Sequence, residues 1–261
     1  MHVLIVGLGW LGRALARELE GAGHRTTGLR SNADPTTDAG RAALPDDADA
    51  VVVCASPGRR GVDAYRHTYV TLNERLTGWA GTRRYVYTGS TGVFGQDDGC
   101  WCDESTPPDP RSPTAEILVE AERIVLGGGG SVVRLSGLYG PGRSGIFERV
   151  RSGRYALGDG DRSWTNWCHL DDAVSTVVAA LLQGRPGAVY HASDAHPARR
   201  AEVVRFVAGR LGIEPPTSVE GVSVPARADR RISAEATREE LGLVPRFPSF
   251  REGLEALLSE A

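Results

Sequence analysis

The stretch HVLIVGLGWLG (residues 2–12) decides the fold. After His2, the residues Val3–Val6 are apolar and mostly β-branched, which is typical of a buried strand, and residues 13–20 favour a helix. A glycine loop between such a strand and such a helix predicts a cradle for the phosphates of a dinucleotide. Gly7 permits the tight turn, Gly9 lets the backbone approach a pyrophosphate, and Gly12 lets the helix pack closely on the strand. The phosphates would then lie at the helix N-terminus, where unpaired N–H groups favour anions.

The next two strands supply the remaining predicted contacts to this cofactor. His24–Leu29 is followed by Arg30 and Ser31, with no carboxylate to bind a ribose 2′-hydroxyl. Arg30 and Ser31 would instead hold a 2′-phosphate, which favours NADP over NAD; the alternative is a solvated loop arginine. Ala50–Cys54 ends in small residues, at the edge of the sheet where ligands bind. The predicted cofactor-binding residues are Gly7, Gly9, Trp10, Leu11, Gly12, Arg30, Ser31, Ala55 and Ser56.

Composition and charge limit the classes of partner. The chain has 261 residues, 41% hydrophobic and 24% charged, which suits one large α/β unit or a core with an appended lobe. Its net charge of −3 indicates neither a nucleic-acid nor a membrane-surface partner. No apolar run approaches the roughly 20 residues that cross a bilayer, and the first strand is too short for a signal peptide, so we expect a cytoplasmic protein. The four cysteines follow no disulfide or zinc pattern, and no metal site is predicted.

Short apolar runs alternate with amphipathic segments along the chain, which predicts an α/β fold with a doubly wound parallel sheet of the Rossmann type. We expect residues 1–145 to form the dinucleotide-binding domain, with 165–192 returning to it, and 146–261 to form a smaller, mainly C-terminal substrate lobe. The expected strands are His2–Val6, His24–Leu29, Ala50–Cys54, Arg84–Thr88, Val132–Leu135 and Val189–Ala192. The expected helices are Leu11–Leu19, Tyr69–Trp79, Thr114–Leu126, Leu170–Leu182, Ala201–Leu211, Ser233–Leu241 and Phe250–Leu258.

Five segments, in order along the chain, carry a family resemblance. They are VGLGWLG (6–12), YTGSTGVFG (87–95), VRLSGLYGPG (133–142), HLDDAV (169–174) and LGLVPRFPSFREGL (241–254). Together they resemble the extended short-chain dehydrogenase/reductase superfamily, also called the NAD-dependent epimerase/dehydratase family. GLYGPGR, HLDD and AHPARR (195–200) resemble its atypical YeeZ-like branch most. The resemblance implies a nicotinamide dinucleotide cofactor and a small-molecule substrate, with sugar nucleotides as the family default.

The chain departs from this family at its catalytic pair. Active members carry Tyr-x-x-x-Lys on one helix, where the four-residue spacing places both side chains on one face. The lysine lowers the pKa of the tyrosine, which then exchanges the proton that accompanies hydride transfer. In the register implied by the resemblance, Thr114 stands in the tyrosine place and Leu118 in the lysine place. The sequence contains no lysine at all, so the standard proton relay is absent.

Four residues are candidates for replacing that relay. Ser90 matches the family's active-site serine or threonine, although a turn serine would look the same. Thr114 retains a hydroxyl. Tyr139 is the leading candidate for a substitute acid, with a packed loop tyrosine as the alternative, and His169 titrates near neutrality but also matches a structural position. Three tryptophans could wall an apolar pocket or pack within the lobe: Trp101, Trp164 and Trp167.

Three functions fit this pattern. The favoured one is an NAD(P)-dependent oxidoreductase or epimerase/dehydratase-like enzyme acting on a small molecule. The second is a dinucleotide-binding sensor or scaffold without catalysis, which the missing pair favours. The third is a cofactor-independent isomerase or cyclase that reuses the crevice. Family members often form homodimers through two helices, here Tyr69–Trp79 and Thr114–Leu126, and the sequence leaves the oligomeric state open.

Overall fold

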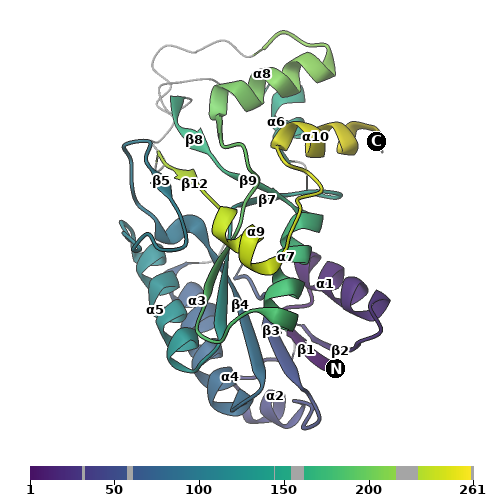
Figure 1. Cartoon of the computed structure of the whole chain (residues 1–261), viewed down its shortest axis with the longest axis vertical. Coiled ribbons are helices and arrows are strands. Elements are labelled where there is room, and N and C mark those ends of the chain that lie inside the picture. The colour runs from purple at the N-terminus through teal and green to yellow at the C-terminus, as the bar shows by residue number, and fades with distance from the viewer. Residues whose placement is uncertain (31–32, 58–60, 144, 154–161, 216–228, 260–261) are drawn as a thin grey trace.

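A six-stranded parallel sheet forms the centre of the computed structural model, which describes all residues except 31–32, 58–60, 144, 154–161, 216–228 and 260–261 (Figure 1). Its strand order is β10-β6-β4-β3-β1-β2, and every neighbouring pair is parallel. The chain runs outward from β1 to β2, then returns to β3 and winds toward the other edge. The predicted doubly wound fold is therefore confirmed. The strands are β1 (His2–Val6), β2 (Arg25–Leu29), β3 (Ala50–Val53), β4 (Arg84–Ser90), β6 (Ser131–Leu135) and β10 (Val189–Ala192).

Helices cover both faces of the sheet (Figure 1). In β1 all five residues are buried, because successive side chains point to opposite faces and both faces are covered. Val3 and Ile5 belong to the core under α1 and α7, whereas Leu4 and Val6 belong to the core under α4 and α5. These four helices are α1 (Trp10–Gly21), α7 (Leu170–Gln183), α4 (Leu72–Ala80) and α5 (Pro113–Gly127).

The helical segment after β3 begins earlier than the predicted start at Tyr69. It consists of α3 (Val62–Tyr65), a π-helical segment η1 (Arg66–Thr71) and α4. Tyr65 and Tyr69 both pack against the core, and their rings meet edge to face at 5.3 Å between centroids. The wider π-turn lets both rings face inward, a pattern that a search for regular helical spacing does not detect. The sequence also gave no expectation of α2 (Asp38–Ala42), which Thr37 caps.

A buried ion pair fixes α5 against the sheet. Arg134 on β6 and Glu122 on α5 each leave 4% of the side chain exposed, and Arg134 Nη2 lies 2.8 Å from Glu122 Oε2. The guanidinium also stacks 4.9 Å above the Phe94 ring. Removing one partner would leave an uncompensated charge in the interior. The pair therefore ties the second half of α5 to β6, beside Gly89 near the carboxyl end of β4.

A second, smaller layer covers the carboxyl ends of the strands (Figure 1). Its own apolar core joins α6 (Gly145–Arg151), α8 (Arg200–Leu211) and α10 (Phe250–Ser259). Short strand pairs and α9 (Glu235–Leu241) connect it to the main sheet. The strands are β5 (Trp101–Cys102), β7 (Gly137–Tyr139), β8 (Trp164–Thr165), β9 (Trp167–His169), β11 (Ala198–Arg199) and β12 (Arg231–Ile232). No helix in the described part of the chain combines the length and the apolar character that a membrane span requires.

Candidate active site

The glycine loop between β1 and α1 has the geometry of a phosphate cradle. Gly7 has a φ of +102°, and a Cβ there would lie 2.4 Å from the Ala55 nitrogen. A Cβ on Gly12 would lie 2.3 Å from the Gly7 carbonyl oxygen, whereas one on Gly9 would find no described atom nearer than 3.9 Å. Gly7 and Gly12 are therefore required by packing within the protein. Gly9 instead leaves open space on the side from which a ligand would approach.

The start of α1 is suited to an anion. Gly9 occupies the N-cap and provides no side-chain hydrogen bond, and the first turn carries no acidic residue. The first N–H groups of a helix have no intrahelical partner, and the helix dipole adds a partial positive charge. The cradle and this helix end together fit the pyrophosphate of a dinucleotide.

Strands β2 and β3 flank the cradle as expected. The N–H groups of Gly7 and Leu8 donate to the Leu29 carbonyl oxygen at 3.0 and 2.8 Å, so that the exposed Arg30 follows directly beside the loop. Ala55 contacts the loop backbone, and the exposed Ser56 is hydrogen-bonded to Tyr69. Ser31 lies outside the described residues.

Trp10 and Leu11 meet the cradle through their backbones, because their side chains turn elsewhere. Leu11 is buried in the core beneath α1. The Trp10 indole donates to the Pro141 carbonyl oxygen at 2.8 Å, and the Arg143 guanidinium lies 5.2 Å from its ring centroid. Trp10 thus ties the cradle to the loop after β7.

Ser90 and Thr114 lie at two neighbouring element ends. Ser90, the last residue of β4, accepts a hydrogen bond from the Gly92 nitrogen at 3.0 Å and caps the short η2 helix (Thr91–Val93). Within the described part of the chain this hydroxyl accepts that bond and donates none, so it can donate to a ligand. Thr114 is half-buried in the first turn of α5, with its hydroxyl 3.1 Å from that of Ser112. Leu118, one turn further, is buried among apolar side chains.

The surroundings of Tyr139 do not suit the role of a proton-donating acid that the sequence predicts. It is 2% exposed, and its hydroxyl has no hydrogen-bond partner among the described groups. Burial raises the pKa of the Tyr139 phenol far above its usual range. Its ring packs edge to face on Trp167 and His169. A phenol held this way supports the lobe and does not reach the crevice.

His169 is likewise a structural residue in this arrangement. It is 3% exposed and occupies the N-cap of α7, where its Nδ1 accepts from the Asp171 nitrogen at 3.2 Å. Phe247 stacks on the imidazole with 4.0 Å between centroids. These contacts hold α7 against the segment that leads into α10. They argue against the expected catalytic role.

A cavity of about 650 Å³ lies between η2 and the start of α5 on one side and β8 and β9 on the other. Its aromatic walls are Phe94, Trp164 and Trp167, and its charged lining residues are Asp97, Arg111 and Arg230. Trp164 and Trp167 meet the expectation of a tryptophan wall, whereas Trp101 is not a lining residue. No sequence pattern predicts a role for Arg230, because it reaches the cavity from more than 60 residues beyond the tryptophans.

The cysteines offer no reactive centre. Burial raises the pKa of Cys54 and of Cys102 to about 12, so that both remain thiols at neutral pH. Nowhere in the described ranges do three His, Cys, Asp or Glu side chains gather as a metal site requires.

The sequence model of one family, described as the NAD dependent epimerase/dehydratase family, matches residues 3–193. The chain belongs to that family. A Streptomyces family relative named 3-diazoavenalumate denitrifying reductase is 28% identical and covers 97% of this chain and 99% of its own. Protein YeeZ of Escherichia coli K12 is 30% identical, and the match covers 82% of this chain and 85% of YeeZ. The solved structure of dTDP-glucose 4,6-dehydratase from Bacillus anthracis in complex with NAD superposes with a TM-score of 0.83 at 19% identity. The match covers 100% of this chain and 97% of the dehydratase chain.

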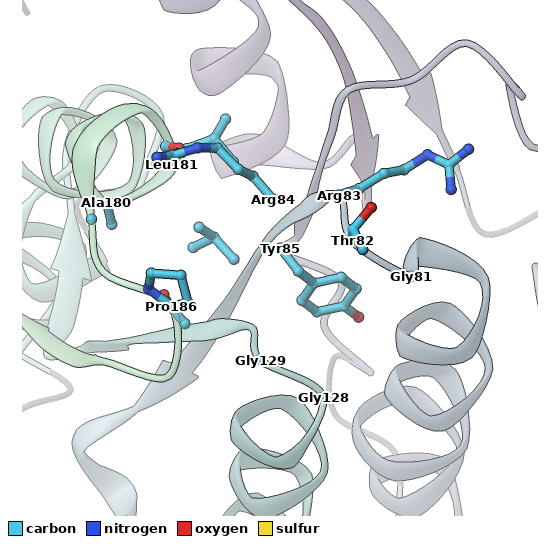
Figure 2. Close-up of a pocket in the computed structure, with 13 residues that line it drawn as sticks. Gly81, Thr82, Arg83, Arg84, Tyr85, Gly128, Gly129, Ala180, Leu181 and Pro186 are labelled. Carbon is cyan, nitrogen blue, oxygen red and sulfur yellow. The ribbon is translucent and has the colours of Figure 1, made fainter.

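A second hollow of about 290 Å³ lies at the amino ends of β4 and β6 (Figure 2). Arg83 and Arg84 are among its lining residues, and both guanidinium groups already donate hydrogen bonds to backbone carbonyl oxygens of the protein. Arg84 Nη1 donates to the Leu181 carbonyl oxygen at 2.6 Å, and Arg83 Nε donates to that of Ala48 at 2.8 Å. Ligands of open parallel sheets bind at the carboxyl ends of the strands, so this amino-end hollow is not the active site.

Proposed function

We propose that this chain is an NAD(P)H-dependent reductase of a small molecule whose reduction needs no tyrosine acid. The observation that carries this proposal is the contrast between the cofactor cradle and the helix position where the family has its lysine. The cradle of Gly7, Gly9 and Gly12 keeps the geometry that a dinucleotide needs. Leu118, in the place of the family's lysine, is buried among apolar side chains and carries no charge that could lower a neighbouring pKa.

NADP is the proposed form of the cofactor, with NAD as the alternative. The support is Arg30, which is exposed and follows Leu29, the residue that accepts two hydrogen bonds from the glycine loop. An arginine at this point suits a 2′-phosphate, whereas a ribose 2′-hydroxyl is usually bound by a carboxylate. Ser31 is proposed to assist Arg30.

The missing pair restricts the class of reaction. A bound nicotinamide supplies hydride, and a carbonyl that accepts hydride becomes an alkoxide that must be protonated. A diazonium group reacts differently. Hydride adds to its terminal nitrogen and gives a neutral diazene, so no alkoxide forms that an active-site acid must protonate. The diazene then loses its N–H proton to water, the carbon–nitrogen bond breaks, dinitrogen leaves, and the carbon takes a proton from water to complete the carbon–hydrogen bond. Because the Streptomyces relative is named a denitrifying reductase of a diazo compound, we place this chain in the same class.

The proposed roles of the chain's own residues are binding and orientation. Ser90 would donate its free hydroxyl hydrogen to the substrate, and Thr114 would lend a second hydroxyl at the start of α5. The strands β8 and β9 would close the substrate cavity through Trp164 and Trp167. Tyr139 and His169 are assigned no proton transfer.

Loss of NADPH absorbance at 340 nm tests the proposal. The acceptors are a 4-substituted benzenediazonium salt, an aldehyde and a ketone. We expect turnover with the diazonium salt alone, above the rate with Gly9→Ala protein, which controls for the reaction without enzyme. Turnover with the carbonyl compounds but not the diazonium salt would contradict the proposed reaction class. NADPH binding with no turnover on any acceptor would favour the alternative of a dinucleotide sensor.

A further inference from the structure

The cavity beside η2 carries features that the proposed reaction does not by itself require. Its volume of about 650 Å³ is in the range of small-molecule sites. It lies next to Thr91 and Gly92, which directly follow Ser90 at the carboxyl end of β4. A molecule in this cavity would therefore lie beside the expected position of the reacting group.

Two tryptophans give the cavity flat and fixed walls. The Trp164 ring is held by two guanidiniums, those of Arg199 at 4.0 Å and Arg231 at 5.1 Å from its centroid. The Trp167 indole donates to the Thr165 hydroxyl at 2.9 Å. Stacking on fixed aromatic faces favours a planar, apolar molecule.

Two arginines line the cavity, and they differ in their partners. Arg111 Nη1 lies 2.7 Å from Asp97 Oδ2, and its Nε lies 2.9 Å from Asp109 Oδ2. Arg230 has no carboxylate partner within the described part of the chain. Its Nη2 donates to the Thr91 carbonyl oxygen at 2.7 Å, while its Nε is sealed from solvent without a hydrogen bond.

The environment of Arg230 disfavours its charge. Burial lowers the pKa of this guanidinium, yet an arginine stays protonated in proteins. A buried charge without a counter-charge is costly, and a ligand anion would remove much of that cost. The planar fork of a guanidinium suits a carboxylate in particular.

We infer that the cavity binds a planar, apolar molecule bearing one carboxylate, and that Arg230 anchors this carboxylate. The inference rests on the proposed function, because it names the substrate class of the same site. A single unpaired guanidinium suits a monoanion. A diphosphate would bring at least two negative charges close to Asp97, and Arg111 is already neutralised by its two carboxylates.

Calorimetric titration of the full chain tests this assignment, with and without NADPH. The probes are trans-cinnamate, its neutral analogue trans-cinnamamide, and UDP-glucose. We expect cinnamate to bind at least 10-fold more tightly than cinnamamide. Arg230→Gln should weaken cinnamate by about 10- to 100-fold and leave cinnamamide unchanged, since a hydrogen bond to a charged group is lost. Arg230→Lys should restore part of the affinity, and the exposed Arg205→Gln serves as the matched control.

Several outcomes would overturn the assignment. They are equal affinities for cinnamate and cinnamamide, an unchanged cinnamate affinity in Arg230→Gln, binding of no probe, and tighter, Arg230-dependent binding of UDP-glucose, which would indicate a diphosphate. Thermal melting and NADPH affinity report whether the variants fold. If Arg230→Gln does not fold, the wild-type comparison of the two cinnamyl probes still decides. Absence of NADPH binding or oxidation would instead contradict the reductase proposal and leave the Arg230 result intact.

Discussion

Replacing Gly9 with alanine should weaken dinucleotide binding while leaving the fold intact, whereas Gly12→Ala should damage both. The two glycines are three residues apart in the same loop, but their surroundings differ. A Cβ on Gly9 would lie 3.9 Å from its nearest described atom, the Gly7 carbonyl oxygen, whereas a Cβ on Gly12 would lie 2.3 Å from that same oxygen. The added methyl of Gly9→Ala therefore fills only the space where the pyrophosphate would approach.

The expected magnitudes follow from these distances. Gly9→Ala should change the free energy of unfolding by no more than about 0.5 kcal/mol, as surface substitutions do. Loss of one charged hydrogen bond costs about 1.5–3 kcal/mol, so its affinity for NADPH should fall by roughly 10- to 100-fold. For Gly12→Ala, overpacking costs about 1–3 kcal/mol. The better helix propensity of alanine offsets up to about 1 kcal/mol of that cost.

Urea unfolding and calorimetric titration of NADPH measure the two effects separately. Gly78→Ala is the matched control, because Gly78 lies in α4 with no described atom within 4 Å of an added Cβ. It should keep the wild-type affinity and unfold at a slightly higher urea concentration. The reasoning fails if Gly9→Ala binds NADPH with wild-type affinity, or if Gly12→Ala is as stable as the wild type.

Three further predictions concern charge. Arg30→Glu should weaken NADPH binding by about 10-fold and leave NADH binding unchanged in the same titration; an equal loss for both would remove the 2′-phosphate argument. Glu122→Gln should lower the free energy of unfolding in urea by about 3–5 kcal/mol, because it leaves Arg134 charged and unpaired in the interior, and a double change to apolar residues should cost less. Burial raises the pKa of Asp194 to about 8, so the folded state holds a proton that the unfolded state releases near pH 4. Stability should therefore fall between about pH 4 and pH 8, by at most about 1.4 kcal/mol per pH unit, and Asp194→Asn should flatten that slope in urea unfolding.

Local patterns sufficed to predict the main sheet and the cofactor loop. Each apolar run became a strand within one or two residues of its expected bounds, because burial on both faces leaves a continuous apolar signature. The cradle was predictable for a similar reason, since only glycine fits at Gly7 and Gly12. The exception was the region around Tyr65, where a π-turn replaces regular helical spacing.

The substrate side could not be predicted to the same depth, because its residues meet through tertiary packing. The sequence predicts Tyr139 in a loop at the crevice, whereas it ends β7 and is buried. Gly253 of α10 leaves room for its phenol, since a Cβ there would lie 2.0 Å from the hydroxyl. Burial of this tyrosine depends on a glycine more than 100 residues away. Arg230 is a residue that the sequence analysis missed. It contacts Thr91, which is 139 residues away in the chain, and no sequence motif includes it.

The contacts of Trp10 have a consequence for how the binding of one ligand affects the other. Its indole joins the cofactor loop to Pro141, and the chain then continues from Arg143 into α6, which packs in the core of the lobe. A ligand that orders one side of this bridge lowers the entropic cost of ordering the other, and such coupling is reciprocal. We therefore expect the dinucleotide and the small molecule each to raise the affinity for the other. Trp10→Phe, which keeps the ring and removes the donor, should make the two binding events more nearly independent in a double titration.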